Sequence, residues 1–250
     1  MQKLMGLMRK AIQKYNMIQP GDRIAVGVSG GKDSVALLAG LAKLREYIGI
    51  PYQVVAITLD YCFDGIETDF TAIQELCQQL DVEYQVVPTE IGKIIFEIRQ
   101  ETNPCSLCAR MRRGCLHDAA KRHSCNKIAL GHHYDDAVET FIMNLFNEGR
   151  IGCFSPVTYL SRKDLTLIRP MVMAEESLIT NTVRRNNLPV VKSKCPADGV
   201  TQRQWTKEWL RQMDKEHPGL KKRLYGAMER GEVDGFSDRE DRPKQQKEEK

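Results

Sequence analysis

The stretch RIAVGVSGGKDS, residues 23–34, decides the fold of this chain. It begins with a short apolar run, residues 23–28, that is typical of a buried strand, and the Ala- and Leu-rich segment 35–44 beyond it predicts a helix. Two glycines between them leave room for backbone N–H groups at the helix N-terminus to close on an anion. A strand, a glycine-rich loop and a helix in this order predict a phosphate-binding loop.

The polar residues of this loop suit a nucleotide. Ser29 and Ser34 add hydroxyl donors and Lys32 adds a positive charge, whereas Asp33 fits beside a phosphate if Mg²⁺ lies between them. The pattern is neither the Walker sequence nor the dinucleotide fingerprint. It resembles the PP-loop of the ATP pyrophosphatases, which cleave ATP to AMP and pyrophosphate. The plainer alternative is a capped helix after a tight turn, because Ser and Asp are good N-caps.

Strands and helices alternate along most of the chain. Apolar runs predict further strands at 52–59, 83–87, 127–130 and 165–169. Helical spacing predicts helices at 4–15, 67–80, 89–99, 108–123 and 136–146, and mostly helix over 175–230 with a break at 188–198. This order predicts an α/β fold with a doubly wound parallel sheet and added N- and C-terminal helices. Because ligands bind beyond the carboxyl ends of such strands, chemistry is expected after the first, second and fourth strands.

The predicted elements divide the chain into four parts. Residues 1–20 hold an N-terminal amphipathic helix, 21–175 the nucleotide-binding core, 176–236 a helical C-terminal part and 237–250 a polar tail. Within that tail, residues 238–250 balance five acids against five bases, which predicts disorder.

Composition indicates a globular protein, since 42% of the 250 residues are hydrophobic and 28% are charged. No apolar run approaches the ~20 residues that span a bilayer. Lys3, Arg9 and Lys10 interrupt any signal-peptide core at the N-terminus, so we expect a cytoplasmic protein without a membrane span. In a reducing compartment its eight cysteines are not expected to form a disulfide framework. The net charge of +4 permits an anionic partner without requiring one.

A second polar motif occupies residues 131–136, after the fourth predicted strand, and is expected to meet the 29–34 loop across the sheet. Gly131 lets the chain pass close to a ligand, and His132 can stack on a nucleotide or hydrogen-bond to it. Asp135 and Asp136 can hold Mg²⁺ or orient a reacting group, although helix capping accounts for one of them. Together the two motifs predict an ATP-using enzyme.

Cys105 and Cys108 are spaced to bring two thiolates to one metal centre or to form a redox pair. A structural zinc site needs four ligands, and the sequence has no second Cys-x-x-Cys. Cys195, in the break between predicted helices, is the favoured third ligand, with Cys115 as the local alternative. Three thiolates on a 4Fe-4S cluster would leave one iron open to exogenous sulfide.

The combination resembles the tRNA 2-thiocytidine synthetases over about residues 20–230. The motifs that carry the resemblance are the loop at 29–34, the cysteine pair with Arg110, Arg112, Arg113 and Gly114 behind it, the motif at 131–136, and Cys195 with Gln202-Arg203 downstream. The resemblance implies an adenine nucleotide alpha-hydrolase-like core and a 4Fe-4S cluster. It implies that ATP adenylates O2 of cytidine 32 in tRNA with loss of pyrophosphate, that sulfide held at the cluster attacks C2, and that AMP leaves.

The resemblance and the loop chemistry together give three sets of site residues. The expected ATP-binding residues are Ser29, Gly30, Gly31, Lys32, Asp33, Ser34, Leu59, Gly131 and His132. The expected catalytic residues are Asp33, Arg112, Asp135 and Asp136. The expected cluster ligands are Cys105, Cys108 and Cys195.

The implied partners are tRNA and a sulfur donor such as a cysteine desulfurase or free sulfide, and a homodimer is a candidate assembly. Basic residues near the motifs suit tRNA phosphates as a set, although each alone can be a solvated helix face. They are Arg110, Arg112, Arg113, Lys121, Arg122, Arg184, Arg185, Lys192, Lys194, Arg203, Lys207 and Arg211.

Two other kinds of function stay open on the sequence. The first keeps the ATP chemistry but thiolates a uridine or makes lysidine. The sequence lacks the additional Cys-x-x-Cys zinc modules of the archaeal-type 2-thiouridine enzymes, and lysidine synthesis needs no cluster. The second is a non-enzymatic module that senses ATP and iron. The carboxylates at Asp33, Asp135 and Asp136 favour catalysis, and release of pyrophosphate would decide between them.

Overall fold

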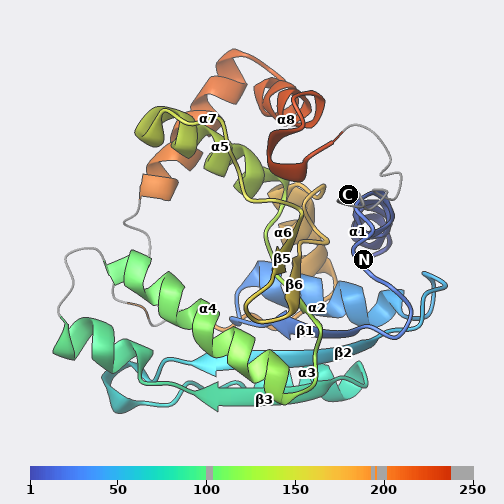
Figure 1. The fold of residues 1–250 in the computed structure, drawn as a ribbon, viewed down its shortest axis with the longest axis vertical. Coiled ribbons are helices and arrows are strands. Elements are labelled where there is room, and N and C mark those ends of the chain that lie inside the picture. Colours follow the sequence, from blue (N-terminus) through green and yellow to red (C-terminus); the bar gives the residue numbers. More distant parts are fainter. Residues whose placement is uncertain (100–103, 193–194, 196–201, 238–250) are drawn as a thin grey trace, which may run out of the picture.

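A six-stranded sheet in the order β3-β2-β1-β4-β6-β5 forms the centre of the computed structural model, which describes residues 1–99, 104–192, 195 and 202–237 (Figure 1). Its strands are β1 (Arg23–Gly27), β2 (Gln53–Asp60), β3 (Glu83–Pro88), β4 (Lys127–Ala129), β5 (Val157–Leu160) and β6 (Leu165–Ile168). The α-helices are α1 (Gln2–Lys14), α2 (Lys32–Leu44), α3 (Thr71–Gln79), α4 (Pro104–Arg122), α5 (Tyr134–Glu148), α6 (Glu176–Arg185), α7 (Gln202–Glu216) and α8 (Leu220–Arg230). Short turns of other helix types lie at Phe63–Gly65, Lys93–Ile98 and Val233–Gly235.

Helices cover both faces of the sheet. Because successive residues of its central strands point to opposite sides, each face carries its own core. Ile24 and Val26 of β1 belong to a large core that also contains the apolar residues of α1, α2 and α6. Ala25, between them, belongs to a second core that includes Leu116 and Ala119 of α4. The predicted doubly wound arrangement is therefore confirmed for β3, β2, β1, β4 and β6, which are all parallel.

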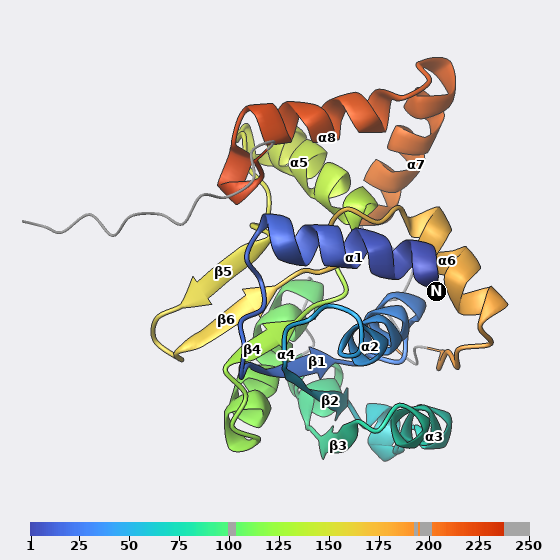
Figure 2. The ribbon, with the colours of Figure 1, turned by 90° about the vertical axis from the view of Figure 1, so that its right-hand side faces the viewer.

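The added helices lie at the two ends of the chain, as expected. Helix α1 buries Leu4, Met8 and Ile12 in the large core, and its Lys14 Nζ lies 2.8 Å from Glu229 Oε1 of α8. Helices α5, α7 and α8 form a group beside the sheet, with α1 running between that group and α2 (Figure 2). No helix in the described part is long and apolar enough to cross a membrane. The expectation of a disordered tail concerns residues that, from 238 on, lie outside the described ones.

Three element predictions were wrong in detail. The sequence reading missed β5, a four-residue strand that pairs antiparallel with β6 and forms a hairpin at the sheet edge. Helix α4 begins at Pro104 rather than at 108, so Cys105 and Cys108 lie in its first turn; Pro favours that position because its fixed φ suits a helix start. The helix predicted at 67–80 begins only at Thr71, after a loop.

The strand order places the switch point between β1 and β4. From β1 the chain builds outward through β2 and β3, then returns to the other side of β1 as β4. The loops after β1 and β4, which carry the two polar motifs, therefore emerge side by side at the carboxyl edge of the sheet.

Candidate active site

The loop after β1 is shaped by its glycines and serines. Gly30 has a φ of +84°, which L side chains rarely adopt, and its carbonyl accepts a hydrogen bond of 3.0 Å from the N–H of Val191. Ser34 Oγ donates to the Gly31 carbonyl (2.8 Å) and accepts from the Ser29 N–H (3.1 Å). Gly31 is the N-cap of α2 and supplies no side-chain cap. The first N–H groups of α2 are thus left for a ligand, which is the arrangement that binds phosphate.

Gly131 brings the second motif against this loop. A Cβ on Gly131 would lie 3.3 Å from both the Asp33 carbonyl carbon and the Ser34 nitrogen. The close neighbour that requires glycine here is thus the backbone of the first loop, whereas the sequence reading assigned the requirement to a ligand. The motifs are packed together by this contact.

A cavity of about 490 Å³ lies where the two motifs meet. Six of the expected ATP-binding residues line it: Ser29, Asp33, Ser34, Leu59, Gly131 and His132. Arg112 and Arg113 of α4 and Arg169 after β6 also line it. A pocket of this size bordered by a helix N-terminus and by arginines suits a nucleotide with its phosphates.

His132 and Arg169, which line this cavity, each have a buried polar atom without a hydrogen-bond partner among the described residues: Nδ1 in His132 and Nε in Arg169. Burial, and next the charge of Arg169, lower the pKa of His132 to about 4, so its imidazole is neutral at pH 7. Burial also lowers the pKa of Arg169 to about 10, which leaves it charged, and its guanidinium lies 4.9 Å from the centroid of Phe154. Buried polar groups are normally paired, so these atoms indicate that the cavity is shaped for a polar ligand.

His132 should also make the protein sensitive to acid. Its folded pKa of about 4 is below the value of about 6.5 in an unfolded chain. Between those values the unfolded state takes up a proton that the folded state does not, so stability falls by up to about 3 kcal/mol as pH drops from about 6.5 to 4. We expect His132→Gln to lose less stability than the wild type over this range in urea unfolding. The exposed His217→Gln is the control, and equal losses in wild type and His132→Gln would contradict the assignment.

The cysteine cavity adjoins the first and has a volume of about 600 Å³. Cys105 and Cys108, from the first turn of α4, line it together with Cys195. Burial raises the pKa of the Cys108 thiol; Arg112 opposes that shift, and the negative charges of Cys195 and Cys105 add to it. Cys115 does not line this cavity and packs against the core beneath α4. The three expected ligands are therefore brought together, and the local alternative is not.

A single metal ion and a 4Fe-4S cluster require different arrangements of their thiolate ligands. Within the described residues, no three His, Cys, Asp or Glu side chains are close enough to share one metal ion. A 4Fe-4S cluster binds each thiolate through a different iron, so its ligands need not converge on one point. Cys105, Cys108 and Cys195 line one cavity, which is what ligands bound to different irons of one cluster require.

Arg112 and Tyr61 stand where the two cavities join. Both line the nucleotide cavity and the cysteine cavity, as do Ser29, Leu59 and Ala109. Burial raises the pKa of the Tyr61 hydroxyl, and the guanidinium of Arg112 opposes that shift. A ligand in either cavity would therefore lie against Arg112.

Comparison with known proteins gives the family. Residues 4–213 match the PP-loop domain family. The tRNA-cytidine(32) 2-sulfurtransferase of Geobacter metallireducens is 39% identical over 234 residues, which cover 92% of this chain and 90% of that enzyme. The enzyme of the same name from Geotalea daltonii is 40% identical over 222 residues, covering 88% and 87%. The chain belongs to the tRNA-cytidine(32) 2-sulfurtransferase family. The expected family resemblance is confirmed.

A solved structure agrees with this family assignment at the level of the fold. The U34-tRNA thiolase NcsA from Methanococcus maripaludis, solved with its 4Fe-4S cluster, superposes with a TM-score of 0.73 at 26% identity. The match covers 90% of this chain and 77% of that one. It confirms the adenine nucleotide alpha-hydrolase-like fold that the PP-loop implies.

Four expected site residues of this family member do not line either cavity: Gly30, Lys32, Asp135 and Asp136. Gly30 shapes the loop after β1 through its positive φ rather than by lining a cavity. Lys32 Nζ lies 2.9 Å from both Asp33 oxygens and 3.0 Å from Glu176 Oε1. Burial lowers the pKa of Lys32, but the hydrogen bonds and charges of Asp33 and Glu176 outweigh it and raise the pKa overall.

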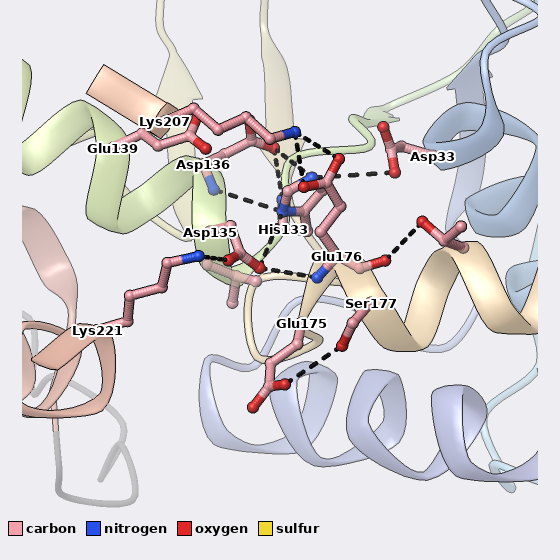
Figure 3. A network of polar contacts seen from close by, with 12 residues as sticks. Asp33, His133, Asp135, Asp136, Glu139, Glu175, Glu176, Ser177, Lys207 and Lys221 are labelled. Carbon is pink, nitrogen blue, oxygen red and sulfur yellow. Dashed lines mark hydrogen bonds and ion pairs between the residues drawn. The ribbon is translucent and has the colours of Figure 1, made fainter. Parts of the chain in front are cut away.

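The two aspartates of the second motif take part in a polar network between α5, α6, α7 and α8 (Figure 3). Asp135 accepts hydrogen bonds from Lys221 Nζ and from the Glu176 N–H, both at 2.8 Å. Asp136 forms a capping box with His133 and lies 3.3 Å from Arg203 Nη1. Both carboxylates therefore have partners within the protein, whereas the sequence reading expected helix capping to occupy only one of them. Their catalytic role stays a prediction.

Several cavity residues were missed by sequence reasoning. Arg169 could have been found, because it directly follows β6, a strand that neighbours β4 at the carboxyl edge. Tyr61 lies in the loop after β2, where chemistry was expected but this residue was not singled out, and Phe96 comes from a segment without a recognisable motif. Lys192, expected among the bases that contact tRNA, lines the cysteine cavity. Lys207 forms a 2.7 Å ion pair with Glu176 instead of projecting alone.

Proposed function

We propose that this chain thiolates tRNA at the expense of ATP: O2 of cytidine 32 is adenylated and then replaced by sulfur delivered through a 4Fe-4S cluster. One observation carries the proposal. The nucleotide cavity and the cysteine cavity adjoin, and Arg112 is one of five residues that line both. Activation of the base and transfer of sulfur must occur at the same carbon, so an enzyme of this kind needs its two sites joined.

At the ATP end, the backbone N–H groups at the start of α2 and the hydroxyls of Ser29 and Ser34 would hold phosphate oxygens. Neutral His132 would offer its unpaired ring nitrogen to the nucleotide. Asp33 would hold Mg²⁺ against the phosphates, because a carboxylate beside an anion needs a cation between them.

At the other end, Cys105, Cys108 and Cys195 would hold the cluster, which when bound supplies an iron position for the sulfur to be transferred. The side chains around it do the rest. Tyr61, Phe63 and Phe96 give the cavity aromatic walls against which a splayed-out base can stack.

Arg112 would act on both halves of the reaction. O2 of the cytosine attacks the α-phosphorus, and pyrophosphate leaves. Sulfur then forms a bond to C2, and the C–O bond breaks to release AMP. Negative charge develops on the α-phosphate in both steps, and a fixed guanidinium beside it stabilises that charge. Donors held in place in a pocket are effective because they need no rearrangement during the reaction.

The remaining requirements follow from this chemistry. Asp33 would hold a Mg²⁺ ion whose charge, when bound, would offset that of the departing pyrophosphate. The sulfur comes from a donor such as a cysteine desulfurase or free sulfide, the chain works in the cytoplasm where tRNA is, and a homodimer is the candidate assembly.

The experiment is anaerobic turnover of the full chain with its cluster, ATP, Mg²⁺, sulfide and unmodified tRNA. We expect AMP, pyrophosphate and 2-thiocytidine in equal amounts, with the modified nucleoside identified by mass spectrometry of the digested tRNA. Reactions without ATP and with a tRNA lacking a cytidine at position 32 are the controls. Thiolation of a uridine instead of cytidine 32 would show that the chain keeps the ATP chemistry but acts on another base. Release of ADP and phosphate would rule out the pyrophosphatase chemistry.

A further inference from the structure

The outer face of α4 bears a stripe of basic residues that begins at the active site. Helix α4 carries five basic side chains and only one acidic one, Asp118. Its first turn lines the cysteine cavity, and its inner side packs on the sheet through Leu116 and Ala119. Figure 1 shows the helix crossing in front of the sheet, away from α1.

Helical geometry gathers part of this charge on one line. At ~100° per residue, Arg110, Gly114 and Lys121 lie within about 40° of one another, and Arg113 lies about 60° to one side. Arg110, Arg113 and Lys121 are exposed. At ~1.5 Å per residue the line from Arg110 to Lys121 is about 16 Å long. We call Arg110, Arg113, Gly114 and Lys121 the α4 stripe; Arg113, at its edge, also lines the nucleotide cavity.

Among the described residues, the charge of the stripe is largely unpaired. In the described part of the chain, Arg110 and Arg113 form no ion pair. Lys121 lies 3.9 Å from Asp164, but the Asp164 side chain is 81% exposed, so this pair is weak. The one acid of the helix, Asp118, is paired with Lys163 at 2.7 Å.

Gly114 supplies an independent observation. Glycine inside a helix is unfavourable relative to alanine, so it normally has a packing reason. Here a Cβ on Gly114 would meet no heavy atom of the described residues within 4 Å. The fold itself therefore does not require glycine at the middle of the stripe, whereas the close approach of a partner's backbone would.

We propose that the α4 stripe is the surface on which the phosphate backbone of the substrate tRNA docks, with the backbone passing closest at Gly114. The inference rests on the proposed function, because that function makes the partner an RNA. A strand held along α4 by its phosphates runs toward the cavity at the first turn, where a base from a loop can enter.

The test measures tRNA binding to the cluster-loaded full chain at several salt concentrations. In Arg110→Gln/Lys121→Gln, the slope of log K against log salt should shrink by about 1.4 to 1.8, because each neutralised phosphate contributes ~0.7 to 0.9. Neither side chain lines the two cavities, so the affinity of the chain for ATP, measured without tRNA, should be unchanged. The matched control is Lys3→Gln/Lys10→Gln, which removes two exposed bases from α1 on the other side of the sheet and should keep the wild-type slope.

The variant Gly114→Gln tests whether Gly114 is needed for tRNA docking or for the stability of the fold. Glutamine is a better helix former than glycine and has open space there, so the melting temperature should not fall. Binding of tRNA should nevertheless weaken, which a purely structural glycine would not predict. Wild-type binding by Gly114→Gln would overturn the close approach. An unchanged slope in the double variant, with wild-type thiolation intact, would overturn the surface alone, whereas a wild type that neither binds nor thiolates tRNA would overturn the proposed function as well.

Discussion

Cys195→Ala is expected to remove the brown colour of the anaerobically purified protein and with it tRNA thiolation. The physical reason is that Cys195 lines the same cavity as Cys105 and Cys108, and a cluster with two remaining thiolate ligands is open on two irons. The visible absorbance and the iron content per chain measure the loss directly. Adenylation of tRNA, measured as pyrophosphate release when ATP and tRNA are both present, should persist, because the nucleotide cavity is lined by the loops after β1 and β4.

Cys115→Ala is the matched control for this prediction. Cys115 is a thiol on the same helix as Cys105 and Cys108, but it packs toward the core and lines neither cavity. The variant should keep both iron and colour. If Cys115→Ala lost the cluster and Cys195→Ala kept it, the ligand set proposed here would be wrong.

Much of the fold could be predicted because its core elements are locally strong. The run 23–28 and the Ala-Leu segment after it are buried on both sides in the structure, which is why they read as a continuous apolar strand and helix. The β5–β6 hairpin was less visible because Val157–Leu160 is a short edge strand, half-buried with one residue exposed. Its pairing depends on contacts with β6 that no local pattern records.

The site was predictable where residue type alone carries the chemistry. The loop at 29–34 and the cysteine pair have few other uses in such positions, and the structure brings them to adjoining cavities. The sequence could not predict which way the carboxylates of Asp135 and Asp136 point. Asp135 and Asp136 follow the right strand, but their partners Lys221 and Arg203 come from helices far along the chain. Long-range ion pairs leave no signal at either residue.

Asp33→Asn is expected to suppress pyrophosphate release while leaving the cluster in place. Asp33 is the one carboxylate of the two motifs that lines the nucleotide cavity, and its side chain is 32% exposed. Asparagine keeps the shape but cannot hold Mg²⁺ by charge. Metal stabilisation of a phosphoryl transition state is worth several kcal/mol, so the rate should fall by about 100-fold or more.

The same measurement on two other variants decides what the aspartates do. Asp81→Asn, an exposed carboxylate just beyond α3, should release pyrophosphate at the wild-type rate. Asp135→Asn should lower the melting temperature, because Lys221 and the Glu176 N–H lose a charged acceptor, with a smaller effect on rate than Asp33→Asn. An equally large fall in rate for Asp135→Asn, with its melting temperature unchanged, would mean that Asp135 leaves Lys221 and turns to the substrate. Undiminished pyrophosphate release by Asp33→Asn would remove Asp33 from the metal site.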